Sequence, residues 1–326
     1  VDGTMDVFTE RGAKARRRRS LLKRLTIVGA VVVVALAPTA WYLSSYERRI
    51  ASYVANMDRL LHMIQGLPSR RESAPIGLPV YYVNMDINAD RRRVIESRLA
   101  SLNPPVKGTR VSGVDGRLLF ESPTVHSGFE WDSAGELGCT LSHLAAARQM
   151  VQDGHDAAVV VEDDAHFGLS RIWPASVCTL VDMLPRTWTT LQLYHGTDPG
   201  QEPTMTAGSH TTLTPYDITA RIRSPGTVAY ALSRRGALML LNLTDGGTTV
   251  HRHKLRTRDG HADTVMYEFP EALPYVVWPR YILPYNDLVT SSSTIHASHT
   301  KHHLWHVRVA SHILERGVQL WRDVGT

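Results

Sequence analysis

The sequence predicts an α/β domain in which a largely parallel sheet is flanked by helices, and three observations support this prediction. Short apolar runs alternate along the chain with stretches of helical periodicity. The run at 157–161 is apolar at every position, as expected for a central strand that is covered on both faces. The segment Ser133-Ala134-Gly135-Glu136 is a capping box, which marks the start of a long helix before that run.

The predicted elements follow one another from residue 80. A strand at 80–83 precedes a helix that Asp90 can cap and that Asn103-Pro104-Pro105 stops. An extended stretch near 109–111 precedes the long helix, which should end at Asp153-Gly154. Two later strands and one later helix complete the alternation, at 191–194, 228–232 and 234–243.

Net charge is concentrated at the start of the chain. Residues 1–24 hold eight basic and three acidic residues, whereas the remaining chain has 28 of each. The body therefore has no general bias toward polyanions, and we expect no nucleic acid among its partners. A hydrophobic content of 43% with ordinary glycine and proline contents excludes disordered and collagen-like chains, and two cysteines exclude a disulfide scaffold.

An uncharged segment of 22 residues, 25–46, follows the basic cytoplasmic tail of 1–24. About 20 apolar residues span a bilayer as a helix, and basic residues beside such a helix stay cytoplasmic. The segment therefore predicts a signal-anchor and a single-pass type II membrane protein, with its body lumenal (Golgi or ER) or extracytoplasmic. The alternatives are a cleaved signal peptide, a nuclear-localisation run and a buried core helix.

The rest of the chain divides into three predicted parts. Residues 47–75 form a stem or linker, 76–295 form the folded domain, and 296–326 form an amphipathic, His-rich terminal helix. The histidines of that helix favour a solvated or core-rim face over a metal site, because no Cys or carboxylate lies near them before Glu315. Asn242 begins an N-glycosylation pattern, and Cys139 and Cys178 either pair or remain thiols.

Three carboxylates come directly after the apolar run, at Glu162, Asp163 and Asp164. Ligands of open α/β sheets bind at the carboxyl ends of strands, and hard oxygen ligands favour Mn²⁺ or Mg²⁺. In an extended stretch, Glu162 and Asp164 would share one side and hold the metal, while Asp163 would hold a sugar or a backbone group. The alternative is a helix N-terminus, where the helix dipole favours acidic residues.

Six segments, in order, resemble glycosyltransferase family 25, which includes bacterial lipooligosaccharide and procollagen galactosyltransferases. The most specific is GELGCTLSHLAAARQMV at 135–151, and the others lie at 80–99, 111–116, 159–165, 226–241 and 261–267. The resemblance implies a GT-A fold, a UDP-sugar donor that is usually UDP-galactose, and Mn²⁺. The opening Asn84-Met85-Asp86 loop departs from the family's more basic run, and the 196–215 loop is idiosyncratic.

The same resemblance places site residues. Donor-binding residues are expected at Asn84, Asp86, Arg91, Arg92, Asp115, Gly116 and Asp163, and supporting residues at Glu136, Ser142, His143, Gly226 and Thr227. Arginines suit phosphate, although a solvated helix face is the alternative for at least one of the three at 91–93. For Glu136 the alternative is a helix cap, and His143 is expected to brace the site by hydrogen bonds rather than to bind metal.

Together these features predict a membrane-anchored, metal-dependent glycosyltransferase that transfers a hexose to a hydroxyl of a protein or glycan acceptor. Inversion at the sugar requires a base, and Asp263 is the candidate, with a helix N-cap as its alternative role. Two other functions compete. One is a catalytically inactive binding or adhesion protein with the same fold. The other is a nucleotidyltransferase or phosphohydrolase, which the segments at 135–143 and 261–264 disfavour.

Overall fold

The computed structural model describes residues 75–119, 133–170, 173, 175–195, 212–215, 226–243, 260–278 and 281–284. All of them belong to one compact unit, Val54–Thr326. The predicted membrane segment at 25–46, the terminal helix at 296–326 and almost all of the stem lie outside the described residues. Within the described ranges, none of the helices combines the length and the apolar character that a membrane span requires.

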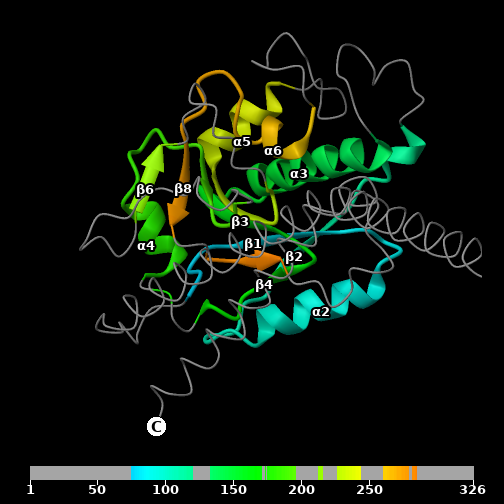
Figure 1. The fold of residues 1–326 in the computed structure, drawn as a ribbon, viewed down its shortest axis with the longest axis horizontal. Coiled ribbons are helices and arrows are strands. Elements are labelled where there is room, and N and C mark those ends of the chain that lie inside the picture. The colour runs from blue at the N-terminus through cyan, green and yellow to red at the C-terminus, as the bar shows by residue number, and fades with distance from the viewer. Residues whose placement is uncertain are drawn as a thin grey trace, which may run out of the picture. The chain divides into compact units, whose positions relative to one another are not determined.

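A mixed, mostly parallel sheet of seven strands forms the centre of the described part of the chain (Figure 1), in the order β2-β1-β3-β7-β5-β8-β6. Strand β1 pairs in parallel with β2 and β3, and β5 pairs in parallel with β8. Strands β7 and β6 run antiparallel to their neighbours. The strands are β1 (Val80–Asn84), β2 (Thr109–Ser112), β3 (Ala157–Glu162), β5 (Thr190–Gln192), β6 (Thr212–Pro215), β7 (Ala229–Ser233) and β8 (Pro274–Trp278).

Helices cover both faces of the sheet, which confirms the predicted α/β class (Figure 1). One face packs against α3 (Ala134–Gln152), α5 (Arg234–Leu241) and α6 (Ala262–Val265). The other packs against α2 (Ala89–Ala100) and α4 (Val177–Asp182). A short ladder of β4 (Ala165–His166) and β9 (Leu283–Pro284) lies apart from the central sheet.

Strand β3 is apolar at every position of its run because it is covered on both faces, as the sequence predicts. Val160 packs in the cluster that contains α3 and α5, whereas Val159 and Val161 pack in the cluster that contains α2 and α4. Tyr81 and Tyr82 of β1 divide in the same way. Because successive side chains of a strand point to opposite faces, a strand that is covered on both faces requires apolar residues at every position.

The helix ends are determined largely by local sequence, with one correction. The capping box is present, since Ser133 and Glu136 exchange side-chain and backbone hydrogen bonds at the start of α3. The prediction that Asp90 caps the helix after β1 is wrong, since Asn88 is the N-cap residue of that helix, α2. The chain turns just before it, where the Asn88 N–H donates to the Met85 carbonyl. Asp90 lies in the first turn and pairs with Arg93.

The antiparallel direction of β7 has a consequence for the site. Val161 of β3 is paired with Ala229 of β7, so the residues that enter β7 lie beside the residues that end β3. The Thr227 hydroxyl thereby reaches Glu162, to which it donates a hydrogen bond of 2.8 Å. A parallel neighbour would have brought its last residues, rather than its first, to this edge of the sheet.

Candidate functional site

A cavity of about 350 Å³ lies at the carboxyl ends of β1 and β3. Its walls come from the loop after β1, the loop between β2 and the 3₁₀ helix Gly116–Leu118, the first turns of α3, and the acidic triplet. This is the edge of the sheet at which the sequence predicts a ligand site. Among the predicted site residues, the lining ones are Asn84, Arg91, Asp115, Gly116, Ser142, His143, Glu162, Asp163 and Asp164.

The acidic triplet does not continue as an extended stretch, so the expected alternation of its side chains is wrong. Strand β3 ends at Glu162, and Asp163 and Asp164 form a turn. Arg91 forms an ion pair with Asp163 and lies 3.7 Å from the Asp164 carboxylate. Nor is this a helix N-terminus, since β4 follows the turn directly. One wall of the cavity, the Arg91 wall, is therefore made by Arg91, Asp163 and Asp164.

Hydrogen bonds and burial define the electrostatics of the Arg91 wall. The Asn84 side-chain amide donates to the Asp163 carboxylate at 2.8 Å. Burial lowers the pKa of Arg91, but the carboxylates of Asp164, Asp163 and Glu162 outweigh it and raise that pKa. Burial, followed by the negative charge of Glu162, raises the pKa of Asp164 to about 7. One arginine therefore does not offset the cost of three carboxylates in this confined space.

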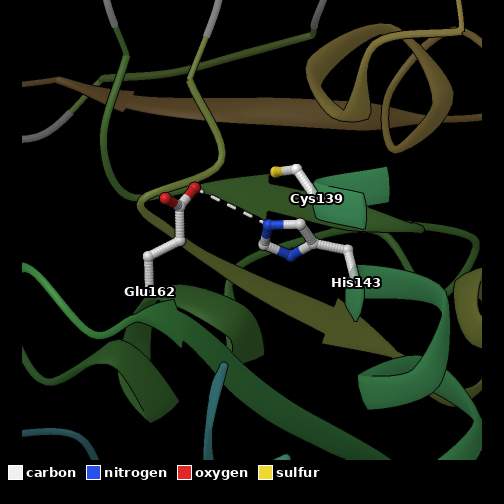
Figure 2. Close-up of side chains that lie close together, drawn as sticks. All are labelled: Cys139, His143 and Glu162. Carbon is white, nitrogen blue, oxygen red and sulfur yellow. Dashed lines mark ion pairs between the residues drawn. The ribbon is translucent and has the colours of Figure 1, made fainter. Parts of the chain in front are cut away.

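A second group of lining residues, here called the Glu162 wall, consists of Glu162 with Cys139 and His143 (Figure 2). Cys139 and His143 are one turn apart on α3, and both side chains point toward the Glu162 carboxylate (Figure 2). The His143 Nε2 lies 3.6 Å from Glu162 Oε1. His143 is fully buried, and its Nδ1 is 3.0 Å from the hydroxyl of Tyr230 on β7, so that the predicted bracing by hydrogen bonds is observed.

Sequence reasoning missed Cys139 as a site residue, because it considered that cysteine only as a disulfide partner or as a buried free thiol. Neither Cys139 nor Cys178 is in a disulfide. The available signal was the spacing of Cys139 and His143, four residues apart at the start of a predicted helix, which places both on one face. Tyr230 was missed as well, since no local pattern links β7 to α3.

The loop between β2 and the 3₁₀ helix fits closely against α3. The Ser142 hydroxyl donates to the Gly138 carbonyl at 2.6 Å and accepts from the Val114 N–H at 2.8 Å. A Cβ at Gly116 would lie 1.8 Å from the Ala134 carbonyl oxygen, so any larger residue would push the loop away from α3. Asp115 lines the cavity, accepts from the Arg117 N–H at 3.1 Å and pairs with the Arg117 side chain.

Two predicted donor-binding residues are not brought to the cavity. Asp86 is exposed, where it pairs with Arg110 and accepts from the Ser112 hydroxyl at 2.8 Å. Arg92 pairs with Glu96 on the exposed face of α2. Neither Asp86 nor Arg92 lines the cavity. Arg92 therefore takes the solvated role that was the alternative for at least one of these arginines.

Asp263 lies in the first turn of α6, close to the Glu162 wall but not among the lining residues. Its carboxylate accepts from the Gly226 N–H at 3.2 Å. His261 occupies the N-cap position, so the N-cap alternative for Asp263 is wrong. The Asp263 charge contributes to the raised pKa of Cys139, behind burial and Glu162. Asp263 thus lies near enough to act electrostatically on the site.

Two further predicted residues, Glu136 and Asn242, lie at helix ends. Glu136 is the N3 residue of the α3 capping box, as its alternative role requires, and lies 3.6 Å from His261 Nδ1. Asn242 is exposed at the C-cap of α5, and its glycosylation stays a prediction.

A comparison with known protein families found a matching model. Residues 78–173 match the family model of glycosyltransferase family 25 (LPS biosynthesis protein). The resemblance found in the sequence is thereby confirmed over these residues, and the match indicates a glycosyltransferase. All of the described residues that line the cavity fall inside the segment that matches glycosyltransferase family 25. A comparison with curated proteins found no match.

Proposed function

We propose that the protein is a membrane-anchored, divalent-metal-dependent glycosyltransferase that transfers a hexose to a hydroxyl of a protein or glycan acceptor, with inversion. Galactose from UDP-galactose is the proposed donor. The observation that carries the proposal is the acidic triplet at the carboxyl end of β3, which lines a cavity whose described lining residues all belong to the family-matched segment. The cavity size suits a small ligand, since ligand pockets are about 300–1,000 Å³.

The residues present fit a divalent cation. One carboxylate oxygen of Asp164, Oδ1, is buried and has no hydrogen-bond partner among the described residues. A buried carboxylate oxygen without a donor is costly unless a cation covers it. Glu162 and Asp164 would hold Mn²⁺ or Mg²⁺, which when bound supplies a counter-charge and Lewis acidity for a diphosphate leaving group.

The chain's own residues have separable proposed roles. Arg91 orients Asp163 and Asp164 and presents cationic N–H donors at the cavity wall, as phosphate binding requires. Asn84 holds Asp163 in place. Asp263 is the proposed base: as the acceptor oxygen bonds to the anomeric carbon and the bond to the diphosphate oxygen breaks, a carboxylate oxygen of Asp263 takes the hydroxyl proton.

A panel of UDP-sugars tests the catalytic proposal. The full chain, purified in detergent with Mn²⁺, should release UDP fastest from UDP-galactose, and EDTA should abolish the release. Faster UDP release from UDP-glucose or UDP-N-acetylglucosamine would identify that sugar, instead of galactose, as the one transferred. UDP binding without release from any donor would instead identify a binding protein that has kept the fold.

Fractionation tests the proposed anchor. The full-length protein should stay in the membrane pellet after a carbonate wash, and its body should be protected from external protease in sealed microsomes. A soluble product whose chain begins near Pro38 would contradict the signal-anchor and identify a cleaved signal peptide.

A further inference from the structure

We propose that Cys139, His143 and Glu162 form a binding site for a thiophilic transition metal of the Zn²⁺ class, separate in its ligand chemistry from the oxygen site at Asp164. The inference goes beyond the proposed transferase and does not require that the protein be active. It depends on the convergence of a thiol, an imidazole nitrogen and a carboxylate at one wall of the cavity.

The distances suit a tetrahedral ion. The three ligand atoms all lie within 4.8 Å of one another. Zinc bonds are about 2.0–2.3 Å, so two nitrogen or oxygen ligands of a tetrahedral ion are about 3.4 Å apart. The His143 Nε2 and Glu162 Oε1 are separated by 3.6 Å, which is too long for a hydrogen bond but near that ligand spacing.

The hydrogen bond at Nδ1 of His143 leaves Nε2 as the nitrogen that can bind a metal. The Tyr230 hydroxyl donates to the Met266 sulfur at 3.7 Å, so its oxygen is left to accept from the His143 Nδ1–H at 3.0 Å. That tautomer leaves the lone pair on Nε2, which is fully buried and has no hydrogen-bond partner among the described residues. A second-shell hydrogen bond from the other ring nitrogen is the usual arrangement of a metal-bound histidine.

The ligand types select the metal. A thiolate and an imidazole favour Zn²⁺ and similar ions over Mn²⁺ or Mg²⁺, which prefer oxygen. Burial raises the pKa of Cys139, so the unligated thiol is protonated and metal binding releases its proton. Three protein ligands leave the fourth position open toward the cavity that all three residues line.

Sharing of Glu162 has a consequence. Glu162 is also a proposed ligand of the oxygen site at Asp164, so Zn²⁺ and Mn²⁺ compete for one carboxylate. Excess Zn²⁺ should therefore weaken Mn²⁺ binding by the full chain, with or without nucleotide.

Cobalt spectroscopy tests the site directly. When Co²⁺ is added to the metal-free full chain in detergent, we expect the intense visible bands of a tetrahedral ion and a thiolate-to-cobalt charge-transfer band, both removed by Zn²⁺. Cys139→Ser should remove the charge-transfer band. The matched control, Cys178→Ser on α4, should keep it. Only weak octahedral bands in the wild type, or a thiolate band that survives in Cys139→Ser, would overturn the proposal.

Two further measurements keep the proposal testable if Cys139→Ser fails to fold. In the wild type, Zn²⁺ should protect Cys139 from alkylation while Cys178 reacts as before, as mass spectrometry would measure. Tyr230→Phe, which removes only the hydroxyl beside His143, should weaken Zn²⁺ binding about 10–100-fold, as loss of second-shell partners does. Equal alkylation of Cys139 with and without Zn²⁺ would contradict the site, and unchanged affinity in Tyr230→Phe would contradict its histidine tautomer.

Discussion

The Arg91 wall and the Glu162 wall of the cavity surround neighbouring carboxylates with different chemical groups. On the Arg91 wall, Asp163 and Asp164 lie beside a guanidinium group, and an amide donates to Asp163. On the Glu162 wall, a carboxylate one residue away lies against a hydroxyl, an imidazole and a thiol. The difference arises where β3 ends, because the turn at Asp163 redirects the chain. Three adjacent acids therefore provide two chemically distinct surfaces.

The largest expected effect concerns Asp263, which the Gly226 N–H ties to the loop beside the Glu162 wall. Asp263→Asn keeps an oxygen that can accept from Gly226 but removes the base. We expect the transfer rate to fall roughly 10²–10⁴-fold, while calorimetry finds Mn²⁺ and UDP binding nearly unchanged. The control is Asp182→Asn on the exposed face of α4, which should transfer normally.

Two results would change the assignment of Asp263. Near-normal transfer by Asp263→Asn would end the base role and leave only the contact with Gly226. Loss of Mn²⁺-dependent UDP binding would move Asp263 into the Mn²⁺ site with Glu162 and Asp164.

Removal of the Arg91 charge should destabilise the folded protein at the Arg91 wall. Arg91→Met leaves Asp163 and Asp164 buried without their counter-charge, which should cost about 3–5 kcal/mol of unfolding free energy in the metal-free protein. The matched control is Arg92→Met: the Arg92 side chain is 48% exposed against 16% for Arg91, so loss of its solvent-screened ion pair should change the unfolding free energy little. Urea unfolding followed by circular dichroism measures both. Equal losses would show that Arg91 is no more important than a surface residue.

Asp164 distinguishes metal binding from structural charge on the Arg91 wall. Asp164→Asn should lower the transfer rate at least about 100-fold, because a direct charge-stabilising group is lost. Isothermal titration should find weaker Mn²⁺ binding in the same variant. Full activity in the presence of EDTA, or in Asp164→Asn, would remove Asp164 from the metal role.

The smallest expected effect is a pH dependence of stability in the metal-free protein. Asp164 has a pKa of about 7 when folded, against 3.8 as its ordinary value. Between these values the folded state binds more protons, so the unfolding free energy should fall as pH rises from about 4 to about 7. Each kcal/mol lost should lower Tm by roughly 2–4 °C. Calorimetry with EDTA at pH 5.5 and 8 measures this slope, and an equal slope in Asp164→Asn would assign it to other groups.

Local rules predicted much of the fold. The capping box of α3 and the apolar run of β3 depend on residues close together in sequence, so both appear as predicted. The same rules placed Glu162, Asp163 and Asp164 at a ligand-binding edge of the sheet, because the change from an apolar run to acidic residues marks the end of the strand in the sequence itself. Asp90 shows the limit of these rules, since a turn at 85–88 moved the helix start by two residues.

The sequence by itself therefore determined the α/β class, the family resemblance and the acidic triplet, all of which depend on short-range patterns. Only the tertiary structure decided which side chains meet. It turned Arg92 away from the cavity while Arg91 entered it, because rotation about the α2 axis separates neighbouring residues. It also placed Asp86, which precedes α2, in an ion pair with Arg110 outside the cavity. The antiparallel pairing of β3 with β7 brought Thr227 to Glu162 and Tyr230 to His143, contacts that span 65 and 87 residues and have no local signal.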